Sequence, residues 1–437
     1  MSTSSYKAEK FGEYHDAATI RRVNLRVLLF LTLGYMFAVM DRGNVSFAAL
    51  QMNERLGFDS AIYGFGAGIT FLGYALFEIP SNIILTRVGA KRWLARIMIT
   101  WGIASAAMMF IWEPIGFYAL RFLLGVAEAG FLPGAIFFVS CWYPATHRGR
   151  AISRMYLGGS VAAAISGIFS ASLLQLDGSA GLAGWQWLFL VQGLPPILIG
   201  ILIAATVPAG PERAPWLDEG QKAWICASAH QPSGRAKVFS AGDLALLKSR
   251  RVLLLSAFGF LTMGAIVTIN LSAPLLLKSE THLSTARIGW IMSGGGVAGM
   301  VGLLIAGWWA DRTGDGMLVA LLGSLVMAVA AILVGTAASE LSIACGLVLF
   351  LAMAPAVTLA NVMSWPNILP SDQLAVGGAL INTISLLGSF IMPYGWGVVR
   401  AASSGFLPGL LLLSLILTGA AAIAWVLRRM DRSRMEA

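Results

Sequence analysis

The chain has 437 residues, of which 57% are hydrophobic and 12% charged, and it contains 49 glycines. Soluble domains carry roughly 25% charged residues, so this composition excludes a soluble globular protein and indicates a polytopic membrane protein. The formal net charge of +9 does not indicate nucleic-acid binding. The basic residues lie between apolar runs and not in one patch with interleaved aromatic residues.

Twelve apolar runs follow one another along the chain. Each can cross most or all of a hydrocarbon layer of ~30 Å as a helix that rises ~1.5 Å per residue. The preceding residues 1–25 are polar and do not resemble a signal peptide, so we expect them to stay in the cytoplasm. The predicted fold class is an all-α integral membrane protein with 12 transmembrane helices, at residues 26–49, 61–85, 93–113, 115–141, 150–173, 186–208, 251–277, 287–310, 316–338, 341–364, 373–398 and 404–427.

The longest polar break, at residues 209–250, divides the runs into six and six. Its proline-rich start and short helix-forming stretch predict a cytoplasmic linker with a surface helix. We therefore expect a six-helix bundle at 26–208, a second one at 251–427 and a cytoplasmic tail at 428–437.

The basic residues favour one orientation in the membrane. Most of the 30 lysines and arginines fall at the helix ends predicted to be cytoplasmic, while the opposite ends carry Arg55, Lys278, Arg287 and Arg400. Under the positive-inside rule this asymmetry places both termini in the cytoplasm. We expect a multi-pass protein of the cell inner (plasma) membrane.

The two halves repeat a pattern of basic residues. Arg26 opens the first run and Arg251 the seventh, and Arg87 follows the second run as Arg312 follows the eighth. Both pairs are 225 residues apart (251 − 26 and 312 − 87). Repeats of this size predict a transporter whose site lies near the midplane between the halves.

The run at 115–141 contains two charges and a glycine on one helix face. Arg121, Gly125 and Glu128 are spaced i, i+4 and i+7. Charge at the bilayer centre costs at least ~2.5 to 3.5 kcal/mol, so this stripe predicts a water-lined interior in which the two charges meet. Glu128 can compete with an anionic substrate for Arg121, which would couple proton uptake to binding. The alternative is a purely structural ion pair.

Asp41 and Arg42 lie about fifteen residues past Arg26, or some 22 Å into the membrane at ~1.5 Å per residue. At that depth both charges must be paired or wet. Asn44 lies one turn on from Asp41. The alternative is a structural clamp that joins Asp41 to Arg42 or to Arg121 and has no role in transport.

Glu78 and Tyr74 form a further polar pair, in the second run. Glu78 lies near the predicted cytoplasmic helix end, where charge costs little, so we favour a gate or loop anchor over a proton site. Tyr74 lies one turn deeper, below the level of an interfacial aromatic belt.

The carboxyl-terminal runs carry no internal charge but offer neutral polar groups, including Asn361, Trp365 and Asn382. This asymmetry predicts a cavity with charge on one side and hydrogen-bonding and aromatic groups on the other. The alternative role for Trp365 is packing against lipid or a neighbouring helix. The alternative role for Asn382 is an interhelical hydrogen bond.

Several motifs resemble known families. The segment Gly307-x-x-x-Asp311-Arg312-x-Gly314 resembles the signature cytoplasmic loop of the major facilitator superfamily, although the first copy has Asn82 and Thr86 in place of Gly and Asp. Across nearly the whole chain, further motifs resemble the anion:cation symporter family, with its tartrate and phthalate branch nearest: Asp41-Arg42-x-Asn44, Gly73-Tyr74-x-x-Phe77-Glu78-x-Pro80-Ser81-Asn82, Arg121-x-x-x-Gly125-x-x-Glu128-Ala129-Gly130, Gly184-Trp185-x-Trp187-x-Phe189, and Asn382 with Pro393-Tyr394.

The resemblance implies proton-coupled uptake of organic anions through a major facilitator fold. It implies that Arg42 binds a substrate carboxylate, that Asp41 takes up protons, and that Tyr74, Trp365 and Asn382 contact the substrate. Arg121 joins this predicted set because a guanidinium presents a fork that matches a carboxylate. The loop residues Arg87, Asp311 and Arg312 are expected to control the conformational change, together with Glu78.

Three other classes are less consistent with the sequence. An integral membrane enzyme needs a metal set or a nucleophile with its base, but the histidines fall in loops or termini and the three cysteines are widely spaced: His15, His147, His230, His282, Cys141, Cys226 and Cys345. A transporter-like sensor is expected to carry a signalling extension. An ATP-driven pump is expected to carry a Walker-type loop, and the sequence contains none.

We therefore predict a symporter that moves a small organic anion inward with H+ by alternating access. Dicarboxylates, hydroxy or sugar acids such as tartrate, and aromatic acids such as phthalate all fit. We expect a monomer in the lipid bilayer with no nucleic-acid partner, no metal and no cofactor, driven by the proton gradient.

Overall fold

The computed structural model describes residues 17–228, 246, 248–313, 315–369, 374–403 and 405–435. Every regular element in these ranges is a helix, as the apolar runs predict. The main helices are α2 (Leu29–Leu56), α3 (Ser60–Val88), α4 (Ala90–Ala107), α5 (Pro114–Glu128), α6 (Phe131–Trp142), α7 (Ala145–Leu174), α8 (Gly184–Thr206), α9 (Glu219–Ser228), α10 (Arg250–Glu280), α11 (Thr285–Thr313), α12 (Gly316–Thr336), α13 (Glu340–Met363), α14 (Trp365–Ile368), α15 (Leu374–Ala402) and α16 (Leu407–Met435).

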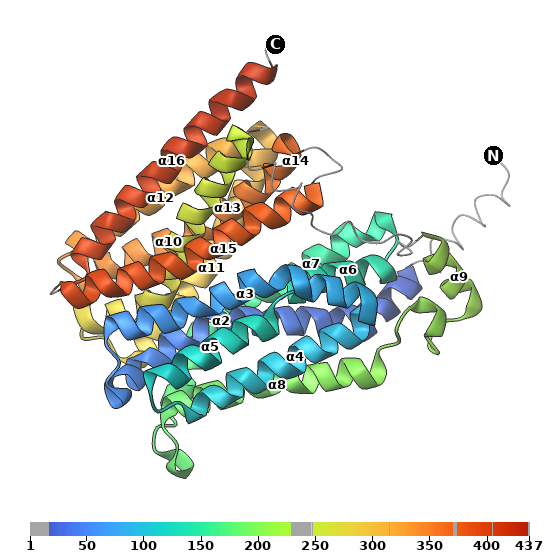
Figure 1. The fold of residues 1–437 in the computed structure, drawn as a ribbon, viewed down its shortest axis with the longest axis horizontal. Helices are drawn as coiled ribbons and strands as arrows, with labels where there is room; N and C mark the ends of the chain where they lie inside the picture. The colour runs from blue at the N-terminus through green and yellow to red at the C-terminus, as the bar shows by residue number, and fades with distance from the viewer. Residues whose placement is uncertain are drawn as a thin grey trace.

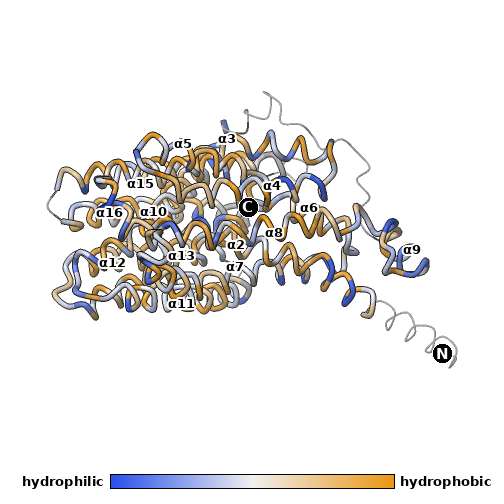
Figure 2. Tube along the Cα trace, turned by 90° about the horizontal axis from the view of Figure 1, so that it is seen from below, coloured by the Kyte–Doolittle hydropathy of each residue, from blue (hydrophilic) through white to orange (hydrophobic). Residues whose placement is uncertain are grey.

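The helices are long and apolar enough for the predicted membrane topology. In the described part of the chain, 11 of them meet the length and hydropathy expected of a membrane span. The run predicted at 373–398 corresponds to α15, which has 29 residues. Hydrophobic residues follow the long helices, whereas α9 in the polar break is largely hydrophilic (Figure 2). Large apolar side chains also cover the outside, including Leu198, Leu304 and Leu415, as lipid contact requires.

The first span begins earlier than predicted. It runs from Ala17 to Leu56, with a π-helical stretch at Asn24–Leu28, whereas the apolar run starts at residue 26. Ile20 and Val23 before that point are buried in the core of the amino-terminal half, so their packing extends the helix through a polar sequence.

The predicted single helix at 115–141 is two helices, which is a correction. The backbone leaves the helical region at Ala129, and Gly130 has φ 85° in the left-handed region that favours glycine. Ser81 of α3 donates a hydrogen bond of 2.6 Å to the Ala129 carbonyl that the break frees. A neighbouring hydroxyl therefore satisfies the broken backbone, as helix breaks in membranes require.

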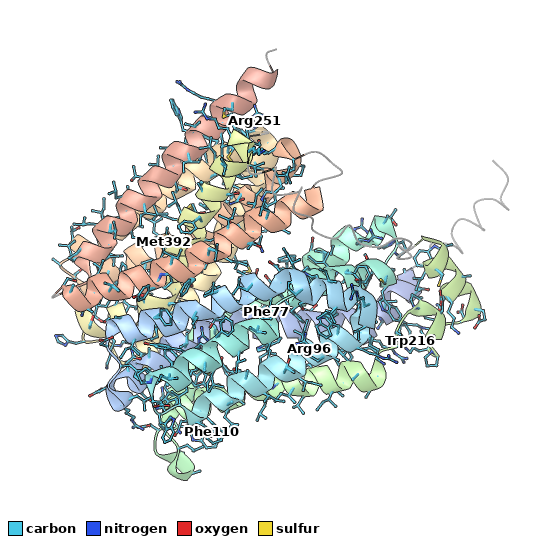
Figure 3. All side chains as sticks on the ribbon, in the orientation of Figure 1. Phe77, Arg96, Phe110, Trp216, Arg251 and Met392 are labelled. Carbon is cyan, nitrogen blue, oxygen red and sulfur yellow. The ribbon has the colours of Figure 1, made fainter. Side chains whose placement is uncertain are left out.

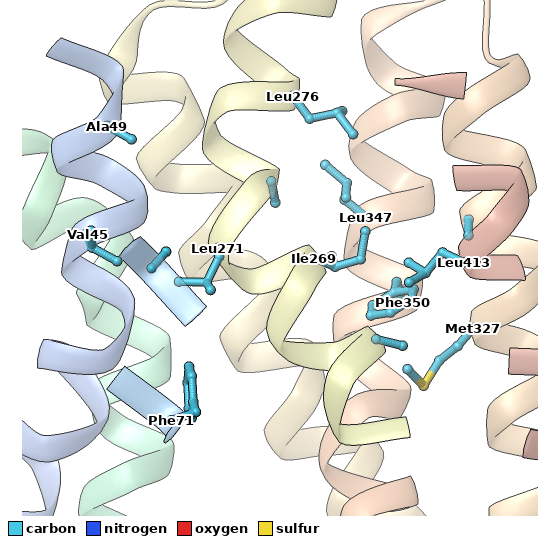
Figure 4. Packing of buried hydrophobic residues seen from close by; sticks show 14 of the residues in the cluster. Val45, Ala49, Phe71, Ile269, Leu271, Leu276, Met327, Leu347, Phe350 and Leu413 are labelled. Carbon is cyan, nitrogen blue, oxygen red and sulfur yellow. The ribbon is translucent and has the colours of Figure 1, made fainter. Parts of the chain in front are cut away.

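The helices form two groups, the amino-terminal half (α2–α8) and the carboxyl-terminal half (α10–α16). Figure 1 shows them close together at one end and diverging toward the end that carries both termini. The contact follows three helix pairs, α3 with α15, α7 with α11 and α2 with α10. In the last pair, Val45 of α2 lies beside Leu271 of α10 in one apolar cluster (Figure 4).

Small residues bring the two halves into backbone contact at the closed end. A Cβ at Gly64 of α3 would lie 2.5 Å from the Pro393 carbonyl oxygen of α15, so only glycine fits there. In the same region Tyr63 donates a hydrogen bond of 2.7 Å from its hydroxyl to the Leu271 carbonyl. Such close approach is how helices associate in lipid, where burial of apolar surface gives no driving force.

Candidate functional site

The main charged contact inside the amino-terminal half joins α2 to α5. Arg42 Nη2 lies 2.6 Å from Glu128 Oε1, and its Nε donates to the same oxygen at 2.9 Å. The Glu128 side chain is 1% exposed and that of Arg42 is 35% exposed, so the carboxylate is buried while part of the arginine side chain stays accessible. The Arg42 guanidinium also lies over the Tyr74 ring, 5.3 Å from its centroid. This arrangement leaves an arginine that can accept a second anion.

The predicted pairing of Glu128 with Arg121 is wrong, because Glu128 pairs with Arg42. The Arg121 guanidinium points toward α3, where its Nη2 donates to the Ala67 carbonyl at 3.1 Å and its Nε to the Gly66 carbonyl at 3.4 Å. Seven residues along a helix amount to a rise of about 10 Å, which separates the two charges. Arg121 contacts α3, whereas Glu128 contacts α2. Arg121 is 1% exposed, and its Nη1 has no hydrogen-bond partner among the described residues.

Asp41 lies in a buried polar cluster between α2 and α4. It accepts hydrogen bonds from Ser105, from Asn44 Nδ2 at 2.8 Å and from Trp101 Nε1 at 3.2 Å. Neither clamp considered from the sequence, to Arg42 or to Arg121, is formed in the described part of the chain. The proton-binding role of Asp41 stays a prediction.

Sequence reasoning missed the two partners of Asp41 on α4. Trp101 and Ser105 are 0% and 1% exposed, and they lie four residues apart on one face of the helix. The available signal was this pair of hydrogen-bonding side chains at helical spacing inside the apolar run 93–113. A polar pair of this kind in a transmembrane segment indicates a hydrogen-bonding partner on another helix.

Glu78 and Asn382 meet across the two halves. Asn382 Nδ2 of α15 donates to Glu78 Oε2 at 3.1 Å, with Oε1 at 3.4 Å. Glu78 is 8% exposed. The structure thus contains the interhelical hydrogen bond that was the alternative for Asn382, and it joins this residue to the predicted gate. A substrate contact by Asn382 stays a prediction.

We expect Glu78→Ala and Asn382→Ala to have non-additive effects on the free energy of unfolding, with a coupling of ~1 kcal/mol from their hydrogen bond. Reversible denaturant unfolding in mixed micelles measures this double-mutant cycle. Asn270→Ala is the matched control, because Asn270 bonds to the Ile266 carbonyl of its own helix at 2.8 Å. Additive effects of the Glu78 and Asn382 changes would contradict the contact.

The remaining predicted side chains lie away from these charges or at helix ends. Trp365 of α14 donates from Nε1 to Asn361 Oδ1 at 3.1 Å, and its ring packs against Gly378, as in its packing alternative. Arg87 is exposed at the end of α3, and Arg312 lies over Trp308 at 5.4 Å. The side chain of Asp311 lies outside the described residues.

An ion pair that the sequence analysis did not single out lies close to these loop residues. Arg428 Nε of α16 and Asp315 Oδ2 are 2.6 Å apart, and Asp315 also caps α12 by accepting from the Leu318 amide at 3.0 Å. The sequence signal was Asp315 directly before a helix, where carboxylates favour the N-cap position.

Two helical bundles with charges buried near their contact are the architecture of a secondary transporter. A family model described as Major Facilitator Superfamily matches residues 31–393. The chain belongs to this superfamily, as a transporter similar to its tartrate branch, and the predicted fold class is confirmed.

The relatives and structural neighbours are transporters as well. The chain is 35% identical over 424 residues to a "Putative tartrate transporter" of Agrobacterium vitis, covering 95% of both chains. It is 36% identical over 404 residues to a "Quinolone resistance transporter" of Acinetobacter baumannii, covering 91% of this chain and 92% of the relative. A solved D-xylose-proton symporter matches with a TM-score of 0.71 at 16% identity, over 92% of this chain and 97% of that one. The prediction that the chain is not an enzyme is confirmed.

Proposed function

We propose that this chain is a symporter that imports a small organic carboxylate together with protons by alternating access. The observation that carries the proposal is the partly exposed Arg42 side chain, which holds a buried Glu128 on one side and lies over a tyrosine ring on another. A guanidinium can bind carboxylate oxygens in bidentate fashion, so Arg42 suits an incoming carboxylate. Relatives with a tartrate-transporter name support an organic acid as the substrate.

Charge balance supports coupling to protons. Asp41, Glu78 and Glu128 oppose Arg42 and Arg121, which makes a net charge of −1 when all five are ionised. A bound monoanion would make it −2, and excess charge is unfavourable in a low-dielectric interior. Proton uptake by a carboxylate that shares an arginine with the substrate removes this excess.

The contact between the halves supports alternating access. They are packed through Gly64 and Pro393 at one end and diverge toward the end with the termini (Figure 1). The positive-inside asymmetry assigns that second end to the cytoplasm, which makes this arrangement inward-facing in the inner membrane. Opening the opposite end would then break the contacts there, including the hydrogen bond from Tyr63 to the Leu271 carbonyl.

A thermal-shift screen of the purified protein against about a hundred carboxylates tests the proposal. A ligand present at 100 times its Kd stabilises the native state by about 2.7 kcal/mol, so true substrates raise the unfolding temperature. We expect stabilisation by some acids, tartrate and phthalate among the candidates, and none by the corresponding neutral amides. Equal stabilisation by an acid and its amide would contradict recognition by arginine.

A further inference from the structure

A basic groove lies on the amino-terminal half, away from the charges of the proposed transport site. It has a volume of about 1090 Å³ and lies between the start of α4 and the end of α8. Its basic lining comes from the α3–α4 turn, the first turns of α4 and the segment after α8: Lys91, Arg92, Arg96 and Arg213. Among the residues that the structure describes, none of those lining the groove is acidic.

Arg96, labelled in Figure 3, is the arginine of the groove whose contacts best indicate a bound anion. Its guanidinium lies on the Trp93 ring, 3.7 Å from the centroid, which holds it in place. Its Nε is buried without a hydrogen-bond partner among the described residues, and its Nη1 contact with Thr100 is long at 3.5 Å. The weak contact of Nη1 leaves this end of the guanidinium available to an anion in the groove.

The groove also has an apolar side, and it lies at the level of the lipid headgroups. The spans Ala90–Phe110 and Gly184–Thr206 begin and end at the groove, so its basic residues lie at the edge of the membrane. Ile99, Ala204 and Ala205 continue the lining along the helices. Below the groove α4 and α8 touch closely, since a Cβ at Gly200 would lie 2.9 Å from the Ala95 carbonyl oxygen. The groove is therefore amphipathic and built on two packed helices.

We propose that this groove binds the phosphate ester of an acidic phospholipid headgroup. Arginine forks and a lysine suit phosphate oxygens, and the apolar wall accommodates the start of the acyl chains. A soluble phosphate compound shares the headgroup chemistry but would not use the apolar wall. The inference is independent of which substrate the transporter carries.

Native mass spectrometry of the detergent-purified chain tests this site, with phosphatidylglycerol and phosphatidylcholine added in turn. Each basic side chain beside an anionic lipid contributes about fivefold in affinity, so Arg92→Gln/Arg96→Gln should reduce phosphatidylglycerol binding roughly 25-fold. Arg92→Lys/Arg96→Lys keeps the charge and should retain most of the binding. Unchanged elution in gel filtration would show that the variants fold.

A charge-matched control is Arg312→Gln/Arg429→Gln. Both arginines lie over tryptophans, Arg312 at 5.4 Å from Trp308 and Arg429 at 3.9 Å from Trp425, but outside the groove. We expect less than a twofold change in this control and at least tenfold weaker retention of phosphatidylcholine by the unmodified chain. Equal binding by the groove variant would overturn the site. Displacement of phosphatidylglycerol by millimolar inorganic phosphate would overturn the lipid as its ligand.

Discussion

Arg42→Lys should reduce the affinity for the transported carboxylate at least tenfold and nearly abolish uptake, although the positive charge is kept. Arg42 uses two of its nitrogens on Glu128 and lies on Tyr74, and a substrate would take the remaining donors of the fork. A lysine ammonium is a point charge that cannot serve both carboxylates in this planar arrangement. Uptake of radiolabelled tartrate or phthalate into proteoliposomes, with binding measured by thermal shift, tests this.

Arg55→Lys is the matched control for this change. Arg55 also lies on α2 and also pairs with a carboxylate, Asp177 Oδ2 at 2.6 Å, but both side chains are solvent-exposed. Surface pairs contribute about 0 to 1 kcal/mol, so this variant should transport normally. Normal affinity and uptake in Arg42→Lys would remove Arg42 from the binding site.

For Arg121→Lys we expect impaired uptake together with lower stability, because the Gly66 and Ala67 carbonyls lose their donor.

Glu128→Gln should separate exchange from accumulation. Glutamine resembles the protonated acid, so it releases the Arg42 guanidinium for the substrate without taking up or giving back a proton. We expect this variant to bind substrate and to exchange it when substrate is present on both sides of the membrane. It should no longer accumulate substrate when a pH step is applied, because coupling needs a carboxylate that changes its protonation state.

The control for Glu128→Gln is Asp177→Asn, which neutralises the other carboxylate that pairs with an α2 arginine at 2.6 Å. It should accumulate substrate as the unmodified chain does. Retained pH-driven accumulation by Glu128→Gln would take Glu128 out of the proton pathway. Asp41, held by Ser105, Asn44 and Trp101, would then be the main candidate.

The sequence was enough to predict the membrane class, the two-bundle fold and the depth of the buried charges. Hydropathy can be read from the local sequence, and long apolar segments form helices in a bilayer. The spacing of the repeats indicates two similar halves. The pairing of the charges could not be predicted in this way. The i, i+7 stripe correctly put Arg121 and Glu128 on one helix, but which neighbour each side chain meets depends on how α2 and α3 pack against it.

Local sequence patterns also could not predict the contacts between distant segments of the chain. Glu78 and Asn382 are 304 residues apart, and no periodicity links them. The break at Gly130 was hidden because its hydrophobic surroundings continue through both α5 and α6. Its signal was the glycine Gly130, which disfavours a helix interior, two residues after a buried acid. The compensating hydroxyl of Ser81 lies on another helix.

The most direct test of the central claim is the internal pH of proteoliposomes that contain a trapped pH-sensitive dye. L-tartrate or phthalate is added outside at equal pH on both sides, while uptake of the same radiolabelled acid is measured in parallel. The proposed mechanism predicts that entry of the carboxylate acidifies the interior and that Arg42→Lys abolishes both signals. Carboxylate uptake without acidification would contradict proton-coupled symport.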